Sequence, residues 1–342
     1  MYAVYSEAHH LHDTAGLVVR GSPLDSDEVP QRAVVLRDAI RDAQLCPVVE
    51  PVDHGLAPIL AVHRADYVEY LRKAYELNAC LLGCAEPLLV GTDLRLERPP
   101  APPEDLEALQ LYYSYDYEEP ILEGTWTAAY WSAQVALTAG DFVREGEWAA
   151  YAICRPPGHH ATADQYGGFC YLNNAAIVAR YLGAGVAILD LDYHHGNGTQ
   201  SIFYTDPAVT YVSLHADPAL DYPYYWGYAN ERGEGAGSGT NHNYPLRLGT
   251  DDVAYLAVLE EALEVIKESA PAYLVVSLGL DLVGGDLIGK FEVTLAGLGQ
   301  IAERVASLKL PTVIVQEGGY ALETLGPNAL AFLQPFAERS YM

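Results

Sequence analysis

The chain has 342 residues, half of them apolar, and its 46 acidic side chains outnumber the 19 basic ones for a formal net charge of −27. This composition allows a sizeable core and argues against extended disorder. The charge disfavours binding to nucleic acid or to anionic membranes and would attract a cationic small molecule, although a solvated acidic surface is the commoner reason for such a charge.

The cysteines predict a reducing compartment, because their number is odd and their spacing is not that of a disulfide-bonded scaffold. They are Cys46, Cys80, Cys84, Cys154 and Cys170. The first residues, MYAVYSEAHH, lack a basic segment followed by an apolar run, and no apolar stretch is long enough to span a membrane. We therefore expect a cytoplasmic protein without a signal peptide or a transmembrane helix.

The first predicted elements are a strand at 2–6 and helices at 30–43, 59–77 and 125–143. Thr125 is the expected N-terminal cap of the last of these helices. Residues 78–124 show no regular pattern and are rich in proline, tyrosine and acids. An irregular segment of this length in a compact domain is usually functional or an interaction segment.

The second half of the chain contains five short apolar runs, separated by helical patterns or loops. They are 149–154, 186–191, 209–214, 272–278 and 311–316, with an amphipathic helix predicted at 255–270. Apolar strands interleaved with helices indicate a mainly parallel sheet that helices cover on both faces. No repeat or linker divides the chain, so we predict a single α/β domain over residues 1–342 with one insertion at 78–124.

Polar residues gather where these strands end. Four of the five runs are followed by histidine or aspartate, and the fifth is followed by EGGY. Ligands of open parallel sheets bind beyond the carboxyl ends of the strands. Because acids and histidines are scarce in cores unless they are paired or bound to metal, this edge of the sheet is the predicted functional site.

The stretch ILDLDYHHGNGT, residues 188–199, predicts a metal site. Alternate side chains of an extended segment point the same way, so Asp192 and His194 can both reach one ion. Such a pair is by itself more often a polar turn, but Asp281 at another strand end supplies a third ligand. Two carboxylates and one imidazole suit Zn²⁺ and leave positions for water and substrate, while Fe²⁺, Co²⁺ or Mn²⁺ could use the same ligands.

The tandem histidines His159 and His160, which follow RPPG, are candidates for proton transfer. Each needs an acceptor on its far ring nitrogen. Asp190 could serve His159 and make it more basic, whereas the neutral amide of Asn197 could serve His160. A charged acceptor on one histidine and a neutral acceptor on the other would give the two rings different basicities. One ring could then act as a base and the other as an electrostatic or acidic partner.

Three aromatic residues complete the predicted site. The glycines of EGGY permit a sharp turn from which Tyr320 could donate a hydrogen bond to an oxyanion. Phe169, next to Gly168 in GGFCYLNN, and Tyr222 could wall a narrow slot for an alkyl chain. An ordinary aromatic core is an equally good explanation of Phe169 and Tyr222.

The run RPPGHHA…GGFCYLNNAA…ILDLDYHHGNGTQ…SLGLD…EGGY resembles the histone-deacetylase-like amidohydrolases of the arginase/deacetylase superfamily. The insertion, the LHADP element and the loop WGYANERGEG are similar to those of the bacterial acetylpolyamine amidohydrolases. The resemblance implies the arginase/deacetylase fold, whose mainly parallel sheet has about eight strands.

The resemblance also implies roles for individual residues. It implies that Asp192, His194 and Asp281 bind one Zn²⁺ per chain and that His159, His160, Asp190, Asn197 and Tyr320 are catalytic. A structural K⁺ is implied at Asp190, Asp192, His194, Ser213 and Leu214. Phe169, Gly168, Tyr222, Glu107 and Glu118 are implied as substrate-binding residues. The insertion at 78–124 is implied to narrow the entrance and to form a homodimer.

We therefore predict zinc-dependent hydrolysis of acetylpolyamines, such as acetylputrescine, acetylcadaverine and acetylspermidine, to acetate and the free polyamine. Neither nucleic acid nor a membrane is an expected partner. A protein lysine deacetylase with the same metal mechanism would fit the same residues. An arginase-type ureohydrolase with two Mn²⁺ ions and a non-enzymatic binder of acylated amines fit the pattern less well.

Overall fold

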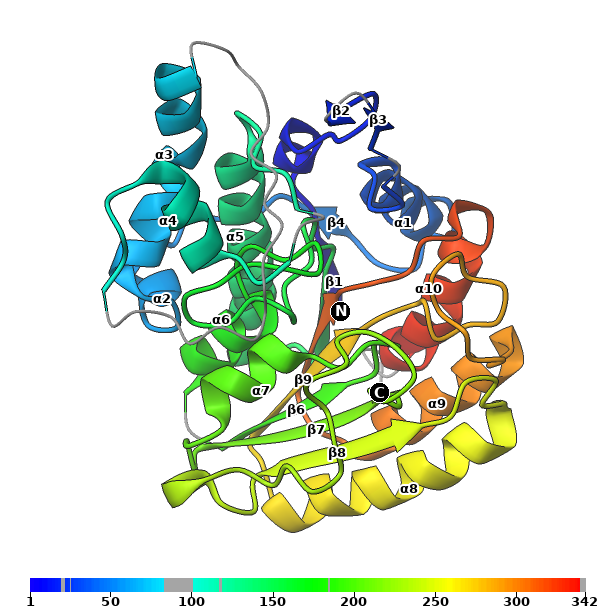
Figure 1. Ribbon diagram of the computed structural model, residues 1–342. Helices are drawn as coiled ribbons and strands as arrows, with labels where there is room; N and C mark the ends of the chain where they lie inside the picture. Colours follow the sequence, from blue (N-terminus) through cyan, green and yellow to red (C-terminus); the bar gives the residue numbers. More distant parts are fainter. Residues whose placement is uncertain (20–21, 25, 83–100, 117–118, 184, 339–342) are drawn as a thin grey trace.

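The computed structural model describes the chain except for residues 20–21, 25, 83–100, 117–118, 184 and 339–342. Within the described residues an eight-stranded sheet runs in the order β4-β1-β5-β10-β9-β6-β7-β8 (Figure 1). Every pairing between its neighbouring strands is parallel. The predicted parallel α/β architecture is confirmed.

The strands of this sheet are β1 (Tyr2–Val4), β4 (Val48–Val49), β5 (Ala149–Ala152), β6 (Val186–Asp190), β7 (Val209–Ala216), β8 (Asn241–Leu246), β9 (Tyr273–Leu278) and β10 (Thr312–Gln316). A separate antiparallel pair consists of β2 (Val18–Val19) and β3 (Ser22–Pro23). The five apolar runs of the second half are therefore β5, β6, β7, β9 and β10, and their centres lie in the sheet as predicted.

Helices cover both faces of the sheet (Figure 1). They are α1 (Gln31–Asp42), α2 (Ala57–Leu60), α3 (Ala65–Leu82), α4 (Leu106–Tyr113), α5 (Thr125–Arg144), α6 (Asn174–Leu182), α7 (Asn197–Phe203), α8 (Asp252–Ser269), α9 (Leu295–Ser307) and α10 (Leu322–Glu338). One apolar cluster joins the sheet to α1, α8, α9 and α10, and a second joins its other face to α5 and α6.

Strand β6 shows why the sheet needs both helical layers. Ala187 and Leu189 belong to the first cluster, whereas Val186 and Ile188 belong to the second. The period of two in a strand sends successive side chains to opposite faces, so a strand that is apolar throughout must be covered on both. Full burial of a side chain such as Leu189 contributes about 2 kcal/mol.

Three local predictions are wrong. The helix predicted at 59–77 is divided into α2 and α3, with residues 61–64 between them. The segment 78–124 is not wholly irregular, because α3 extends to Leu82 and α4 forms at Leu106–Tyr113, where the carboxylate of Asp105 accepts the N–H of Ala108. Thr125 is the first helical residue of α5 rather than its cap. Its hydroxyl oxygen accepts the N–H of Leu122 at 2.7 Å and so stabilises the turn before the helix.

None of the helices in the described part of the chain combines the length and the apolar character needed to cross a bilayer.

Candidate active site

The strand order brings the predicted site residues together. Strands β5, β10, β9 and β6 are consecutive neighbours and all run parallel, so the loops after them leave the same edge of the sheet. These loops carry the two tandem histidines, Tyr320, Asp281 and Asp192, in that order across the sheet. Residues up to 161 positions apart in the sequence, from His159 to Tyr320, therefore lie in one place.

The three predicted metal ligands converge. Each of Asp192, His194 and Asp281 offers a donor atom, and these atoms all lie within 4.8 Å of one another. Nδ1 of His194 is 3.3 Å from Oδ1 of Asp192 and 3.2 Å from Oδ2 of Asp281. Residues 192–194 form a bend rather than the extended segment expected, and the intervening Tyr193 is buried in the core, where its hydroxyl donates to Asp221 at 2.6 Å.

The chemistry of this cluster fits a divalent cation. Apart from this close approach of His194, no described residue donates a hydrogen bond to the buried Oδ2 of Asp281. Burial and the neighbouring carboxylate of Asp192 raise the pKa of Asp281 to about 7. Two buried carboxylates this close repel each other unless a positive charge lies between them, and two carboxylates with one imidazole are a ligand set that zinc uses.

Two glycines keep the cluster compact. A Cβ atom at Gly279 would lie 2.3 Å from Oδ2 of Asp192, and one at Gly318 would lie 2.5 Å from Oδ2 of Asp281. No other residue type fits at either position without displacing the carboxylates. The glycines of SLGLD and EGGY thus have a steric role at the candidate metal site.

The histidine pair lies beside this cluster with the two acceptors that the sequence suggested. Nδ1 of His159 is 3.2 Å from Oδ2 of Asp190, and Nδ1 of His160 is 2.7 Å from Oδ1 of Asn197. Burial opposes a charge on His159, but the carboxylates of Asp192 and Asp190 outweigh it and raise its pKa to about 10. Burial and the nearby His159 lower the pKa of His160 well below its usual value.

Two of the residues predicted to hold a monovalent cation, Asp190 at the end of β6 and Ser213 within β7, lie on neighbouring strands. Asp190 stands opposite Ser213 in the register of these strands, and Oδ1 of Asp190 accepts the N–H of Asp192 at 3.2 Å. Leu214 is fully buried beside them. The hydroxyl of Ser213 lies 2.8 Å from Nδ1 of His215.

Arg32 of α1 contacts both the ring of Tyr320 and the backbone just before it. The guanidinium carbon of Arg32 lies 4.7 Å from the ring centroid of Tyr320, and its Nε donates to the carbonyl of Gly319 at 2.6 Å. The backbone N–H of Tyr320 donates to Oδ2 of Asp286 at 2.7 Å. Burial raises the pKa of the Tyr320 phenol well above 10, so the hydroxyl keeps its proton and can donate it in a hydrogen bond.

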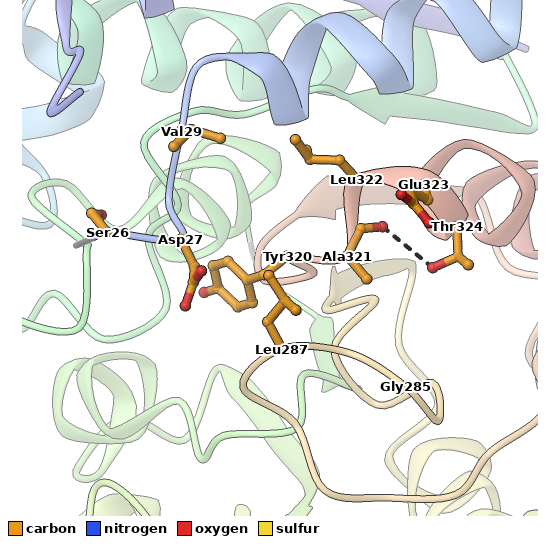
Figure 2. Close-up of a pocket in the computed structure, with 10 residues that line it drawn as sticks. All are labelled: Ser26, Asp27, Val29, Gly285, Leu287, Tyr320, Ala321, Leu322, Glu323 and Thr324. Atoms are coloured by element: carbon orange, nitrogen blue, oxygen red, sulfur yellow. Dashed lines mark hydrogen bonds between the residues drawn. The ribbon is translucent and has the colours of Figure 1, made fainter. Parts of the chain in front are cut away.

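A groove of about 540 Å³ adjoins Tyr320 on the surface. Tyr320 lines this groove, and Figure 2 shows its ring between Asp27 on one side and Leu287 on the other. The other lining residues are Ser26, Val29, Gly285, Ala321, Leu322, Glu323 and Thr324. The walls of the groove therefore come from the N-terminal segment, the loop after β9 and the start of α10.

The rings of Phe169 and Tyr222 each contact one of the predicted catalytic side chains. The Phe169 ring lies edge-on to Tyr320, with 5.9 Å between centroids, and the Tyr222 ring lies edge-on to His160 at 5.1 Å. Gly168 has a left-handed backbone (φ +57°), and a Cβ there would lie 2.3 Å from Cδ2 of His160. Because Gly168 has no side chain, its backbone can lie directly against the ring of His160.

The insertion contributes two residues that the sequence analysis did not identify. Tyr115 is buried and its hydroxyl donates to the carbonyl of His160 at 2.9 Å. Glu119 is 2% exposed and accepts the N–H of Phe169 at 2.9 Å. Glu118 lies outside the described residues, and Glu107 is part of α4 without a described side chain.

Comparisons with known proteins agree with this fold. Residues 26–335 match the family model described as the histone deacetylase domain. Acetylpolyamine amidohydrolase 1 of Pseudomonas aeruginosa is 45% identical over 98% of this chain and 99% of its own length. Acetylpolyamine amidohydrolase of Mycoplana ramosa is 38% identical over 98% of this chain and 100% of its own length.

A solved structure is similar along the whole chain as well. The acetylpolyamine aminohydrolase of Burkholderia pseudomallei superimposes with a TM-score of 0.92 at 42% identity, covering 98% of both chains. The family match spans most of the sequence, and the relatives match it nearly end to end. The chain therefore belongs to the histone deacetylase family.

Proposed function

We propose that this protein is a zinc-dependent amidohydrolase that cleaves the acetyl amide of acetylpolyamines to acetate and free polyamine. The convergence of Asp192, His194 and Asp281 next to the histidine pair is the observation that carries the proposal. The family is metal-dependent and acts on amides, and the relatives named acetylpolyamine amidohydrolases match 98% of the chain. The substrates we expect are acetylputrescine, acetylcadaverine and acetylspermidine.

Asp192, His194 and Asp281 would hold the zinc ion. When bound, the ion supplies Lewis acidity at the acetyl carbonyl and acidifies a water molecule. Fe²⁺, Co²⁺ or Mn²⁺ would suit the same ligands. The protein's own groups perform the proton transfers and hold the reacting atoms in place.

His160 is the proposed general base and acid. Its lowered pKa keeps the ring neutral near pH 7. The side-chain amide oxygen of Asn197 accepts from Nδ1, so the ring proton lies on Nδ1. Nε2 then keeps its lone pair, so it can take a proton from the attacking water and return it to the leaving amine.

His159 and Tyr320 are proposed to stabilise negative charge. The carboxylates of Asp192 and Asp190 raise the pKa of His159, so it can act as a buried cation. The Tyr320 hydroxyl keeps its proton and can donate to the oxyanion that develops on the acetyl carbon. Phe169 and Tyr222 would enclose the methylene chain of the substrate between their rings.

The remaining expectations belong to the same proposal. Glu107 and Glu118 of the insertion would face the distal ammonium group, and the insertion would pair two copies of the chain. Leu77 and Leu111, on α3 and α4 at the insertion, are 39% and 44% exposed, which supports a protein contact there.

Two further proposals concern K⁺ and the cellular location. The carboxylate of Asp190 and the hydroxyl of Ser213, on adjacent strands, support a structural K⁺. Among the described cysteines, Cys46, Cys80, Cys154 and Cys170 are free thiols, which supports a cytoplasmic location.

Steady-state kinetics on the purified, zinc-loaded enzyme test the function. We expect kcat/KM for acetylputrescine to exceed that for an acetyl-lysine peptide by at least about 100-fold, which corresponds to about 2.7 kcal/mol. A chelator should abolish turnover, and zinc should restore it. A preference for the peptide would make the protein a lysine deacetylase, and absence of turnover on either compound would refute the proposal. Two bound transition metals per chain would favour the ureohydrolase instead.

A further inference from the structure

Glu317 is a buried carboxylate at the site that has no task in the mechanism above. It is the first residue of EGGY, follows β10 directly, and is 0% exposed. Burial raises its pKa to about 7. Burying an ionisable side chain is costly unless hydrogen bonds compensate, so its contacts indicate what the residue does.

The carboxylate of Glu317 contacts the backbone of the histidine loop, by which we mean residues 155–160 (RPPGHH). Oε2 accepts the N–H of Gly158 at 2.7 Å and the N–H of His159 at 3.2 Å. The other oxygen, Oε1, accepts the hydroxyl of Ser277 from the neighbouring strand β9 at 3.2 Å. Both oxygens are therefore bonded, and two of the three donors immediately precede the ring of the proposed buried cation.

The backbone of Glu317 is itself fixed. Its N–H donates to the carbonyl of Leu278 at 2.8 Å, and its carbonyl accepts Nη2 of Arg32 at 2.6 Å. The following residue, Gly318, donates its N–H to Oδ2 of Asp192 at 2.8 Å. This short turn thus contacts the histidine loop and a candidate metal ligand, and it leads directly to Tyr320.

The loop at Gly158 packs closely against the backbone of residues 172–174. A Cβ atom at Gly158 would lie 2.5 Å from the backbone nitrogen of Asn174 and 2.7 Å from the carbonyl oxygen of Leu172. The loop is therefore in contact with backbone at Gly158, and the carboxylate of Glu317 bonds the N–H groups of Gly158 and His159.

We propose that Glu317 is a positioning residue, whose carboxylate fixes His159 and His160 relative to Tyr320 by accepting the N–H groups of Gly158 and His159. The inference rests on the proposed deacetylase function. Glu317 touches no reacting atom, so its effect passes through the histidine pair.

Two substitutions separate hydrogen bonding from charge. Glu317→Met keeps the length of the side chain and removes both acceptors, and we expect kcat to fall about 100-fold with KM within about threefold, because a displacement near 1 Å costs a factor of this size. Glu317→Gln keeps an oxygen for the two N–H groups and turns its NH₂ toward Ser277, whose hydroxyl can accept. It should restore kcat to within about threefold of the wild type.

A control variant measures the effect of lost stability alone. Asp141 of α5 accepts from Nε2 of His54 at 2.7 Å and from the hydroxyl of Tyr181 at 2.6 Å, and it has no contact with the site. Asp141→Leu removes these two bonds, so it should lower the melting temperature and leave kcat unchanged.

A double-variant cycle tests whether Glu317 acts through the histidines. In a background that carries both His159→Ala and His160→Ala, Glu317→Met should reduce the residual kcat by less than about threefold, because the groups that it positions are gone. Equal losses in both backgrounds, an unchanged kcat in folded Glu317→Met, or a Gln variant as slow as the Met variant would each overturn the inference. A wild type that hydrolyses no acetylated amine would instead refute the proposed function.

Discussion

Gly168→Ala should displace His160 without altering any group that takes part in the reaction. The new Cβ would lie 2.3 Å from Cδ2 and 2.7 Å from Cγ of the His160 ring. Unbonded carbons pack no closer than about 3.5 Å, so the ring or the loop must move by about 1 Å. A misplacement of this size costs about 100-fold in kcat, or about 2.7 kcal/mol of transition-state stabilisation.

The same substitution also introduces backbone strain, which a second glycine can measure separately. Gly168 has φ +57°, and an alanine in the left-handed region loses about 1 kcal/mol of stability. Gly249 has φ +76° with nothing within 4 Å of an added Cβ, so Gly249→Ala carries the strain without the collision.

Steady-state kinetics on acetylputrescine and thermal melts of both variants decide the outcome. We expect Gly168→Ala to melt below Gly249→Ala because of the collision, and we expect a loss of kcat in Gly168→Ala alone. If folded Gly168→Ala keeps kcat within about threefold of the wild type, the steric argument for His160 is wrong.

Three more substitutions test the site. Tyr320→Phe should lower kcat by about 10²–10³ with little change in KM, as the loss of one oxyanion donor does, and an unchanged kcat would exclude this role. Asp281→Asn should abolish zinc binding, measured by elemental analysis, and should raise the melting temperature of the metal-stripped protein, because the amide removes a carboxylate whose ionisation burial and Asp192 disfavour. A zinc content equal to that of the wild type would contradict the ligand assignment. Glu28 is 2% exposed and lies 2.9 Å from Nη1 of Arg32 and 2.8 Å from Nε of Arg155. Glu28→Gln should therefore lower the free energy of unfolding, measured with urea, by about 3 kcal/mol, and a change below about 1 kcal/mol would show that the buried charge matters little.

The core strands could be predicted because their signal is local. A run such as VAILD in β6 is apolar at every position but the last, and a strand of this kind is stable only inside a covered parallel sheet. Asp192, His194 and Asp281 could be predicted for a related reason, since parallel strands place all their carboxyl ends at one edge. The type of side chain and its place after a strand were therefore sufficient to propose a metal centre.

Other parts of the fold depend on pairing partners far along the chain. Strand β4 has two residues, and β8 contains the polar sequence NHNYPL, so neither has a strand signal of its own. Both lie at the edges of the sheet, where β1 and β7 supply the backbone partners. Pairing energy from a neighbouring strand outweighs weak local propensity at such positions.

The order in which strands pair also explains the site residues that no sequence pattern indicated. Arg32 and Glu317 are separated by 285 positions, and Glu317 and Gly158 by 159, yet each pair forms a hydrogen bond. Composition and spacing predicted which chemical groups gather at the sheet edge, because those depend on short segments. Which backbone N–H each carboxylate accepts depends on distances between segments that meet only when the sheet has assembled, and these contacts set the positions of His159, His160 and Tyr320.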